Sequence, residues 1–204
     1  MPSTPAPGAR LLRLWRTLSP LPGGKWIYSR LLGFSVPYTG SVRPGVEELR
    51  PGYARVSMRD RRAVRNHLHS IHAIALANLA EVTSGLAMIV ALPENSRSIV
   101  TAFSIEYLKK ARGRLSAECT APPVDASVEG EHSIQSLVYD STGDVVARAT
   151  ARWLVGPRED RSESDTLQRA PEWSRSDAAT RSGGNGNSNS NSNSNSTSGK
   201  AGGA

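Results

Sequence analysis

Three polar side chains in the middle of the sequence have types and spacings suited to chemistry: Asn66, His72 and Glu81. Asn66 and His72 belong to a short polar loop, and Glu81 follows inside an apolar run. Burial disfavours the ionised form of a carboxyl group and can raise its pKa by up to about 3–5 units. Glu81 is therefore either a structural acid bonded within the core or a carboxylate that faces a water-filled cleft and acts in catalysis.

The element that carries Glu81 is predicted to be one long buried helix over residues 73–92. Its residues, AIALANLAEVTSGLAMIVAL, are apolar or small on all sides of a helical wheel, which is typical of a helix enclosed by the rest of a protein. The run is long enough for a membrane span. Asn78 and Glu81 near its centre, and the strand-like sequence around it, argue against that alternative. We expect no transmembrane segment.

Strands are predicted on both sides of this helix. Residues 40–48 and 53–59 indicate two strands joined by a turn at Pro51 and Gly52. After the helix, apolar and polar residues alternate in a strand with one shared face. That face is expected to carry Ile99, Thr101, Phe103, Ile105 and Tyr107.

The rest of the folded chain is predicted to be an antiparallel run of strands. They cover residues 115–120, 132–139 and 145–153, and residues 140–144 form a hairpin loop between the last two. Alternate residues from Val145 to Trp153 are expected to face inward. One long helix with strands before and after it predicts an α+β architecture, in which a single curved sheet packs on the helix.

The net charge of +7 is concentrated near the N-terminus. Residues 1–46 contain six basic side chains and no acidic one, so the remaining chain is close to neutral. We therefore expect no positively charged surface on the folded domain that could bind a nucleic-acid backbone, which argues against a nucleic-acid-binding protein. The lone Cys119 excludes an intrachain disulfide and fits a reducing compartment.

The sequence divides into three parts. Residues 1–24 form a basic segment with a short amphipathic helix, in which Arg10, Arg13 and Arg16 recur at every third position. This segment is a helix covering one edge of the domain, a mitochondrial transit peptide, or a helix on a membrane surface, so the expected compartment is the cytoplasm or the mitochondrion. Residues 25–156 form the domain, and the Asn-Ser-rich residues 157–204 are predicted to be disordered.

The order of loop, helix and strand resembles the hotdog-fold acyl-CoA thioesterases of the phenylacetic-acid-pathway type. The stretch NHLHSIHAIALANLAE takes the place of that family's loop asparagine, helix start and helix carboxylate, and VTAFSIEYLKKARG is similar to its next strand. The whole segment from LLGFSVPYTG to ARWLV looks like an uncharacterised branch of this superfamily. The resemblance implies a curved antiparallel sheet wrapped around one central helix, preceded here by an N-terminal helical extension.

The resemblance also implies a role for each candidate residue. Glu81 is the general base or the nucleophile, and the Ala73 amide stabilises the oxyanion. Asn66 positions water or the carbonyl, and His72 fixes the loop or bonds the thioester oxygen, with Thr101 as a further residue to orient water. Ala73 and Ile74 replace the family's two glycines, but a backbone N–H at a helix start still donates from alanine.

The implied substrate is an acyl-CoA or acyl-carrier thioester, with coenzyme A as part of the substrate and no separate cofactor. The phosphates of coenzyme A are expected near a cluster of cations just past the strand, although the same cluster is also typical of a solvated turn that protects an edge strand. These cations are Lys109, Lys110 and Arg112. The histidines at positions 67, 69 and 72 lack a recognisable metal motif, so we expect no metal site.

A homodimer or a dimer of dimers is implied, with two active sites at the subunit interface. Two other function classes stay open beside thioester hydrolysis. One is a non-catalytic acyl-CoA-binding protein, which the change to Ala73 and Ile74 makes plausible. The other is a dehydratase or hydratase with the same fold.

Overall fold

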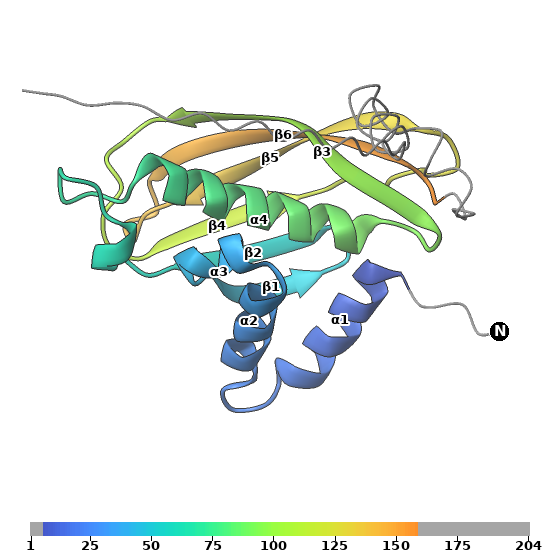
Figure 1. Ribbon diagram of the computed structural model, residues 1–204, viewed down its shortest axis with the longest axis horizontal. Coiled ribbons are helices and arrows are strands. Elements are labelled where there is room, and N and C mark those ends of the chain that lie inside the picture. The colour runs from blue at the N-terminus through green and yellow to red at the C-terminus, as the bar shows by residue number, and fades with distance from the viewer. Residues whose placement is uncertain (1–5, 159–204) are drawn as a thin grey trace, which may run out of the picture. The chain divides into compact units, whose positions relative to one another are not determined.

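The computed structural model describes residues 6–158 of the 204-residue chain. Helices and strands follow one another in the order shown in Figure 1. The elements are α1 (Pro7–Leu18), α2 (Gly24–Ser35), α3 (Pro37–Val42), β1 (Gly45–Arg50), β2 (Tyr53–Met58), the 3-10 turn η1 (Arg62–Val64), α4 (Ala73–Ala91), β3 (Ser96–Tyr107), β4 (Leu115–Thr120), β5 (Gly130–Tyr139) and β6 (Val145–Pro157).

The six strands form one antiparallel sheet with the order β1-β2-β4-β5-β6-β3. This order places β1 and β3 at the two edges, although β3 directly follows the helix in sequence. The predicted hairpin between β5 and β6 is confirmed, because the Asp140 amide donates to the Asp144 carbonyl. The predicted inward face of β6 is also confirmed, since Ala147, Ala149, Ala151 and Trp153 are buried.

The long central helix is confirmed as α4, which runs along the sheet (Figure 1). Its apolar side chains pack on β2, β4, β5 and β6, so Leu79, Ala80 and Thr83 are inaccessible to water. Length and apolar composition alone would let Ala73–Ala91 cross a membrane, but most of this helix is buried inside the protein. The same apolar sequence therefore makes the core helix of the sheet.

The N-terminal helices lie on the side of the domain that carries β1 (Figure 1): α1 and α3 contact α4, and α2 packs on β1. Helix α1 approaches α4 backbone to backbone, because a Cβ at Gly8 would lie only 2.1 Å from the Ile89 carbonyl oxygen. Trp15 of α1 packs edge-on against Tyr28 of α2, with ring centroids 5.1 Å apart. Helix α1 therefore packs on the end of α4, as a helix that covers part of the domain would.

The predicted start of the first strand was wrong. Residues 40–48 were expected to be extended, but α3 continues to Val42 and β1 begins only at Gly45. Pro37 is suited to the first turn of a helix. Gly33 and Gly40 then allow α2 and α3 to touch, since a Cβ at Gly40 would lie 2.3 Å from the Gly33 carbonyl oxygen. This close packing is a tertiary contact that the local pattern does not reveal.

The predicted alternation along β3 was also wrong, because a β-bulge interrupts it. Val100 pairs with Trp153 and Ala102 pairs with Arg152, which leaves Thr101 as the extra residue. A bulge shifts the side-chain alternation by one position. Val100 therefore shares the face of buried Trp153, while Ile99 lies on the opposite face.

The predicted disordered tail, residues 157–204, lies outside the described residues, apart from its first two.

Candidate active site

The start of α4 presents an unpaired backbone amide. His72 is the N-cap residue, with φ −65° and ψ 140°, and its Nδ1 accepts a hydrogen bond of 3.1 Å from the Ile74 amide. The Ala73 amide has no hydrogen-bond partner among residues 6–158. A helix N-terminus carries partial positive charge, and its first amides are free to bind an oxyanion. This amide therefore has the chemistry that the resemblance implies for Ala73.

The loop before α4 is held in one conformation by Asn66. Its Oδ1 accepts hydrogen bonds from the Leu68 amide at 2.9 Å and from the Ser70 amide at 3.2 Å. The backbone N–H of Asn66 in turn donates to the Ser70 carbonyl, and the backbone N–H of His72 donates to the Val64 carbonyl. The side-chain oxygen of Asn66 is therefore committed to the loop, and His72 is committed to the helix cap.

Glu81 lies on the one face of α4 that keeps contact with solvent. Going along the helix from its start, this face contains exposed Ile74 and half-buried Ala77 before it reaches half-buried Glu81. The carboxylate has no ion pair or side-chain hydrogen bond among residues 6–158, and burial raises its pKa above the usual glutamate value. Within the described residues, Glu81 is thus a partly desolvated acid without a cationic partner, an environment that occurs at functional sites.

Two buried side-chain atoms have no hydrogen-bond partner among residues 6–158. Asn78, one turn earlier in α4, has an unbonded Oδ1, and Trp153 of β6 has an unbonded Nε1. Trp153 reaches α4 one turn after Glu81, since a Cβ at Gly85 would lie 3.7 Å from its ring. Buried polar atoms of folded proteins are normally hydrogen-bonded to protein or to water, so a water molecule would satisfy each of these two.

Thr101 lies on the edge strand and is bonded to the backbone. As the extra residue of the β3 bulge it is exposed, and its Oγ1 donates to the Arg152 carbonyl at 3.3 Å. Bulges re-aim side chains and are common next to active sites.

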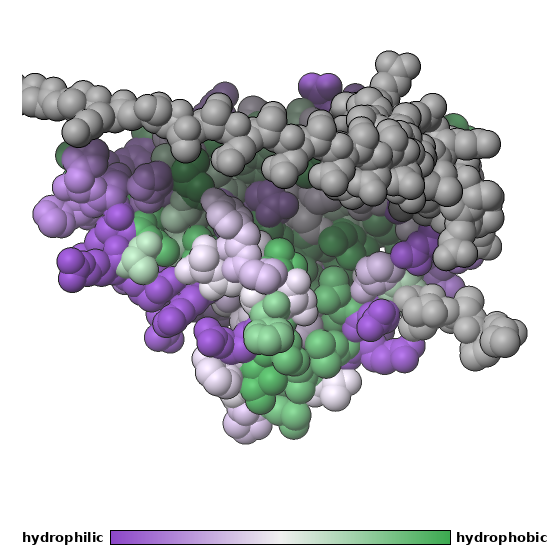
Figure 2. Space-filling model, viewed as in Figure 1, coloured by the Kyte–Doolittle hydropathy of each residue, from purple (hydrophilic) through white to green (hydrophobic). Residues whose placement is uncertain are grey.

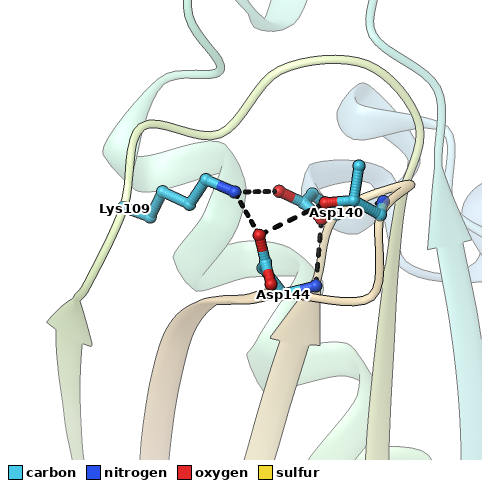
Figure 3. Close-up of polar contacts among 4 residues, drawn as sticks. Lys109, Asp140 and Asp144 are labelled. Atoms are coloured by element: carbon cyan, nitrogen blue, oxygen red, sulfur yellow. Dashed lines mark hydrogen bonds and ion pairs between the residues drawn. The ribbon is translucent and has the colours of Figure 1, made fainter.

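The three cations after β3 are not equivalent. Lys109 is held between Asp140 and Asp144 of the β5–β6 hairpin, with Nζ–O distances of 2.9 and 2.5 Å (Figure 3). Lys110 and Arg112 are exposed, and within residues 6–158 neither forms an ion pair. Two carboxylates already neutralise Lys109, so Lys110 and Arg112 are the cations of this cluster that are available to a phosphate.

The sequence did not single out Tyr107 or Asn78 as site residues. Tyr107 ends β3, and its hydroxyl donates to the Ala73 carbonyl at 3.1 Å. Asn78 was noted only as a polar interruption of the apolar helix. Its spacing of three residues from Glu81 was a usable signal, because residues at i and i+3 lie on one face of a helix. The contact of Tyr107 with α4 had no signal in the sequence.

The geometry brings some candidates together and separates others. Asn66, His72 and Ala73 gather at the start of α4, whereas Glu81 lies eight residues along the same helix. At 1.5 Å per residue, the Ala73 and Glu81 backbones are about 12 Å apart. Among residues 6–158, no three His, Cys, Asp or Glu side chains are placed to hold a metal ion.

Comparisons with known proteins agree with this architecture. The model of a family described as a domain of unknown function, DUF4442, matches residues 24–155. A structural-genomics protein of known structure is 31% identical, with a TM-score of 0.64, and the alignment covers 74% of this chain and 98% of that one. A search of curated proteins found no match.

Two more distant structures share the fold. A Pseudomonas aeruginosa protein named a probable thioesterase is 23% identical, with a TM-score of 0.57, and the alignment covers 68% of this chain and 97% of that one. A mutant of the phenylacetic acid degradation protein PaaI from Thermus thermophilus is 19% identical, with a TM-score of 0.50, covering 58% of this chain and 97% of that one. The predicted hotdog fold is thereby confirmed.

Proposed function

Because this chain belongs to the DUF4442 family and has the hotdog fold, we propose that it hydrolyses acyl-CoA or acyl-carrier thioesters to a free acid and a thiol. The observation that carries the proposal is Glu81, a half-buried carboxylate with a raised pKa and no ion-pair partner in the described part of the chain. It lies on a helix face that leads to an unpaired amide at Ala73. The names of the related structures, a probable thioesterase among them, support the same class of reaction.

In this proposal Glu81 and the Ala73 amide act on opposite sides of the thioester. The carboxylate of Glu81 removes a proton from water, whose oxygen bonds to the carbonyl carbon. The carbonyl oxygen becomes an oxyanion that the Ala73 N–H stabilises, which is worth about 3–4 kcal/mol for such a donor. The carbon–sulfur bond then breaks, and the thiolate takes up a proton. Direct attack by Glu81 on the carbonyl, followed by hydrolysis of the anhydride, is the alternative route.

In this proposal the two groups come from two copies of the chain. A carbonyl oxygen and the attacking water both lie within about 3 Å of the groups that serve them. The Ala73 and Glu81 backbones are about 12 Å apart along one helix, which is too far for both to reach one carbonyl group. Two copies related by a two-fold axis would bring the Ala73 of each to the Glu81 of the other.

The free edge of the sheet supports such a dimer. β3 is an edge strand, and along its 12 residues most side chains are exposed, including Ile99 at 62% and Tyr107 at 47%. A long edge strand with exposed apolar side chains is a template for pairing with another strand. Antiparallel pairing of β3 with its own copy would pack Ile99 against the partner strand and bring Thr101 to the interface.

The remaining candidates would position the substrate. Asn66 and His72 hold the loop that presents the Ala73 amide, because their side chains bond the loop and the helix cap. Thr101 would orient water from the partner strand. Lys110 and Arg112 would bind the phosphates of coenzyme A, and Lys109 would contribute less because Asp140 and Asp144 already bind it.

One observation favours the second candidate function, a non-catalytic acyl-CoA-binding protein. Ile74 is 54% exposed on the same face of α4 and directly follows the amide that would hold the oxyanion. A branched side chain at this point narrows the approach to the Ala73 N–H. If it blocks that approach, the acyl chain would still bind along the helix but no hydrolysis would follow.

A panel of acyl-CoAs tests the proposal through release of free thiol. Wild-type protein should turn over at least one chain length, and Glu81→Gln should lower kcat by about 10²–10⁴-fold without loss of fold. Glu94→Gln is the matched control, because Glu94 is an exposed acid just beyond α4. Absence of turnover combined with a rise in melting temperature on adding acyl-CoA would favour the binding protein. Hydration of trans-2-enoyl-CoA would favour the dehydratase or hydratase class.

A further inference from the structure

Helix α2 exposes an apolar face that nothing in the described chain covers. Trp26 is 68% exposed and Phe34 is 88% exposed, and they lie two turns apart on one side of the helix. Ile27 and Leu31 flank them and are also exposed, while Tyr28 and Ser29 on the opposite side are buried. Exposed apolar residues scattered singly are ordinary, but a continuous stripe marks an interaction surface.

The stripe continues around the corner between α2 and α3. Val36 and Tyr38 are 45% and 68% exposed there, and Leu21 precedes α2 with similar exposure. In Figure 2 hydrophobic surface gathers over the part of the molecule where Figure 1 places α2, with hydrophilic surface beside it. Aromatic side chains next to polar surface are typical of proteins that lie at a membrane–water interface.

A cationic cavity adjoins this stripe. It has a volume of about 1030 Å³ and lies between α2, α3 and the first residues of β1, with Trp26 and Phe34 among its walls. Six cations line it: Lys25, Arg30, Arg43, Arg59, Arg61 and Arg114. The one acid in its wall, Glu47, is already bound by Arg114 and by the Ser57 hydroxyl.

The other five cations have no carboxylate partner among residues 6–158. Arg61 donates instead to the carbonyls of Ser41 and Val42, at 3.2 and 3.0 Å. Burial and the nearby charge of Arg43 lower the pKa of Arg61. Cations crowded together in this way repel one another, and an external anion would relieve the repulsion.

We propose that α2 and the adjoining cationic cavity dock on the surface of a lipid bilayer that contains anionic lipids. Trp26 and Phe34 would insert between headgroups, and the cations around Arg30 and Arg43 would bind lipid phosphates. A soluble phosphate compound would fill the cavity but leave the apolar stripe exposed to water. A second copy of the chain would bring the same positive charge to the contact. This inference goes beyond the proposed hydrolysis and does not depend on it.

Sedimentation of the full chain with vesicles tests the proposal. Binding should be strong to phosphatidylcholine vesicles containing phosphatidylglycerol, weak to pure phosphatidylcholine, and reduced by high salt. The double variant Trp26→Ala and Phe34→Ala should lose binding, and Arg30→Gln and Arg43→Gln should each weaken it roughly fivefold. Val128→Ala and Arg50→Gln are controls, because these exposed residues lie outside α2 and the cavity. Equal binding to both vesicle types, or wild-type binding by the double variant, overturns the proposal.

Fluorescence gives an independent measurement on the same protein. Trp26 emission should shift to shorter wavelength on binding vesicles, and brominated acyl chains should quench it, whereas Trp26→Phe should abolish both changes. Saturable binding of pyrophosphate without any vesicle binding would assign the cavity to a soluble phosphate compound and would also overturn the proposal. Acyl-CoA hydrolysis in solution should be unchanged in all these variants, so the two proposals can fail separately.

Discussion

The Tyr107 hydroxyl donates a hydrogen bond to the Ala73 carbonyl across 3.1 Å. This bond joins the end of the edge strand β3 to the first turn of α4, although the two residues are far apart in sequence. The strand proposed to pair with another copy is thereby tied to the residue whose amide is proposed to bind the oxyanion. Dimer formation and the position of the Ala73 amide are therefore expected to depend on each other.

Removing this hydroxyl should impair the site more than the fold. Tyr107→Phe should cost about 0.5–1.5 kcal/mol of stability at most, the net value of an ordinary hydrogen bond. Thioesterase kcat should fall further than this small loss of stability explains, because the first turn of α4 loses its anchor. Urea unfolding measures the first effect and steady-state kinetics the second. An unchanged kcat would show that the bond has no part in positioning.

Replacing Ala73 by proline tests the amide itself. Proline lacks an N–H and is well accepted at the first position of a helix, and His72 already has the extended conformation that a residue before proline prefers. The fold should survive, and kcat should drop by about 10²–10³-fold. Circular dichroism and kinetics check the two effects, with Ala77→Gly as a control for an altered helix. Full activity of Ala73→Pro would exclude this amide as the oxyanion donor.

Mixing two inactive variants tests whether each site uses two copies. Glu81→Gln and Ala73→Pro are each inactive as homodimers in this proposal. In a mixed dimer one site combines both defects and the other has neither. After subunit exchange at equal concentrations, half the dimers are mixed, so about a quarter of wild-type activity should return. A site contained within one chain would show no recovery.

The raised pKa of Glu81 gives stability a specific pH dependence. A group whose pKa is higher in the folded state favours folding at low pH, and this contribution is lost as pH rises through the folded-state pKa. Glu81→Gln should therefore match wild type in free energy of unfolding below about pH 4 and become the more stable protein towards neutral pH. Urea unfolding across this range measures the difference, and a gap that widens on acidification would contradict it.

A charge on the edge strand should prevent dimer formation. Ile99→Lys places an ammonium group on exposed β3, where lysine commonly blocks pairing with another strand. The variant should be a folded monomer by light scattering and should lose thioesterase activity. Val128→Lys is the matched control, because Val128 is 73% exposed but lies outside every strand. A dimer that tolerates Ile99→Lys would place the interface elsewhere.

The sequence by itself determined those elements whose patterns are local. The apolar run from Ala73 indicated a helix enclosed on all sides, and the alternation from Val145 indicated a half-buried strand, because each pattern has the period of that element. Residues 140–144 indicated a hairpin loop, because all five are residue types that favour turns. The helix that contains Glu81 also followed from the sequence, whereas the half-buried face on which Glu81 lies did not.

Tertiary structure decided how these elements meet. Residues 40–42 are helical because Gly33 and Gly40 let α2 and α3 touch, and the bulge at Thr101 turns Ile99 to the outer face. The bond from Tyr107 to Ala73, the pairing of Lys109 with two aspartates and the cationic cavity all join residues distant in sequence. Such contacts depend on how complete helices and strands pack together, and local sequence patterns do not predict that packing.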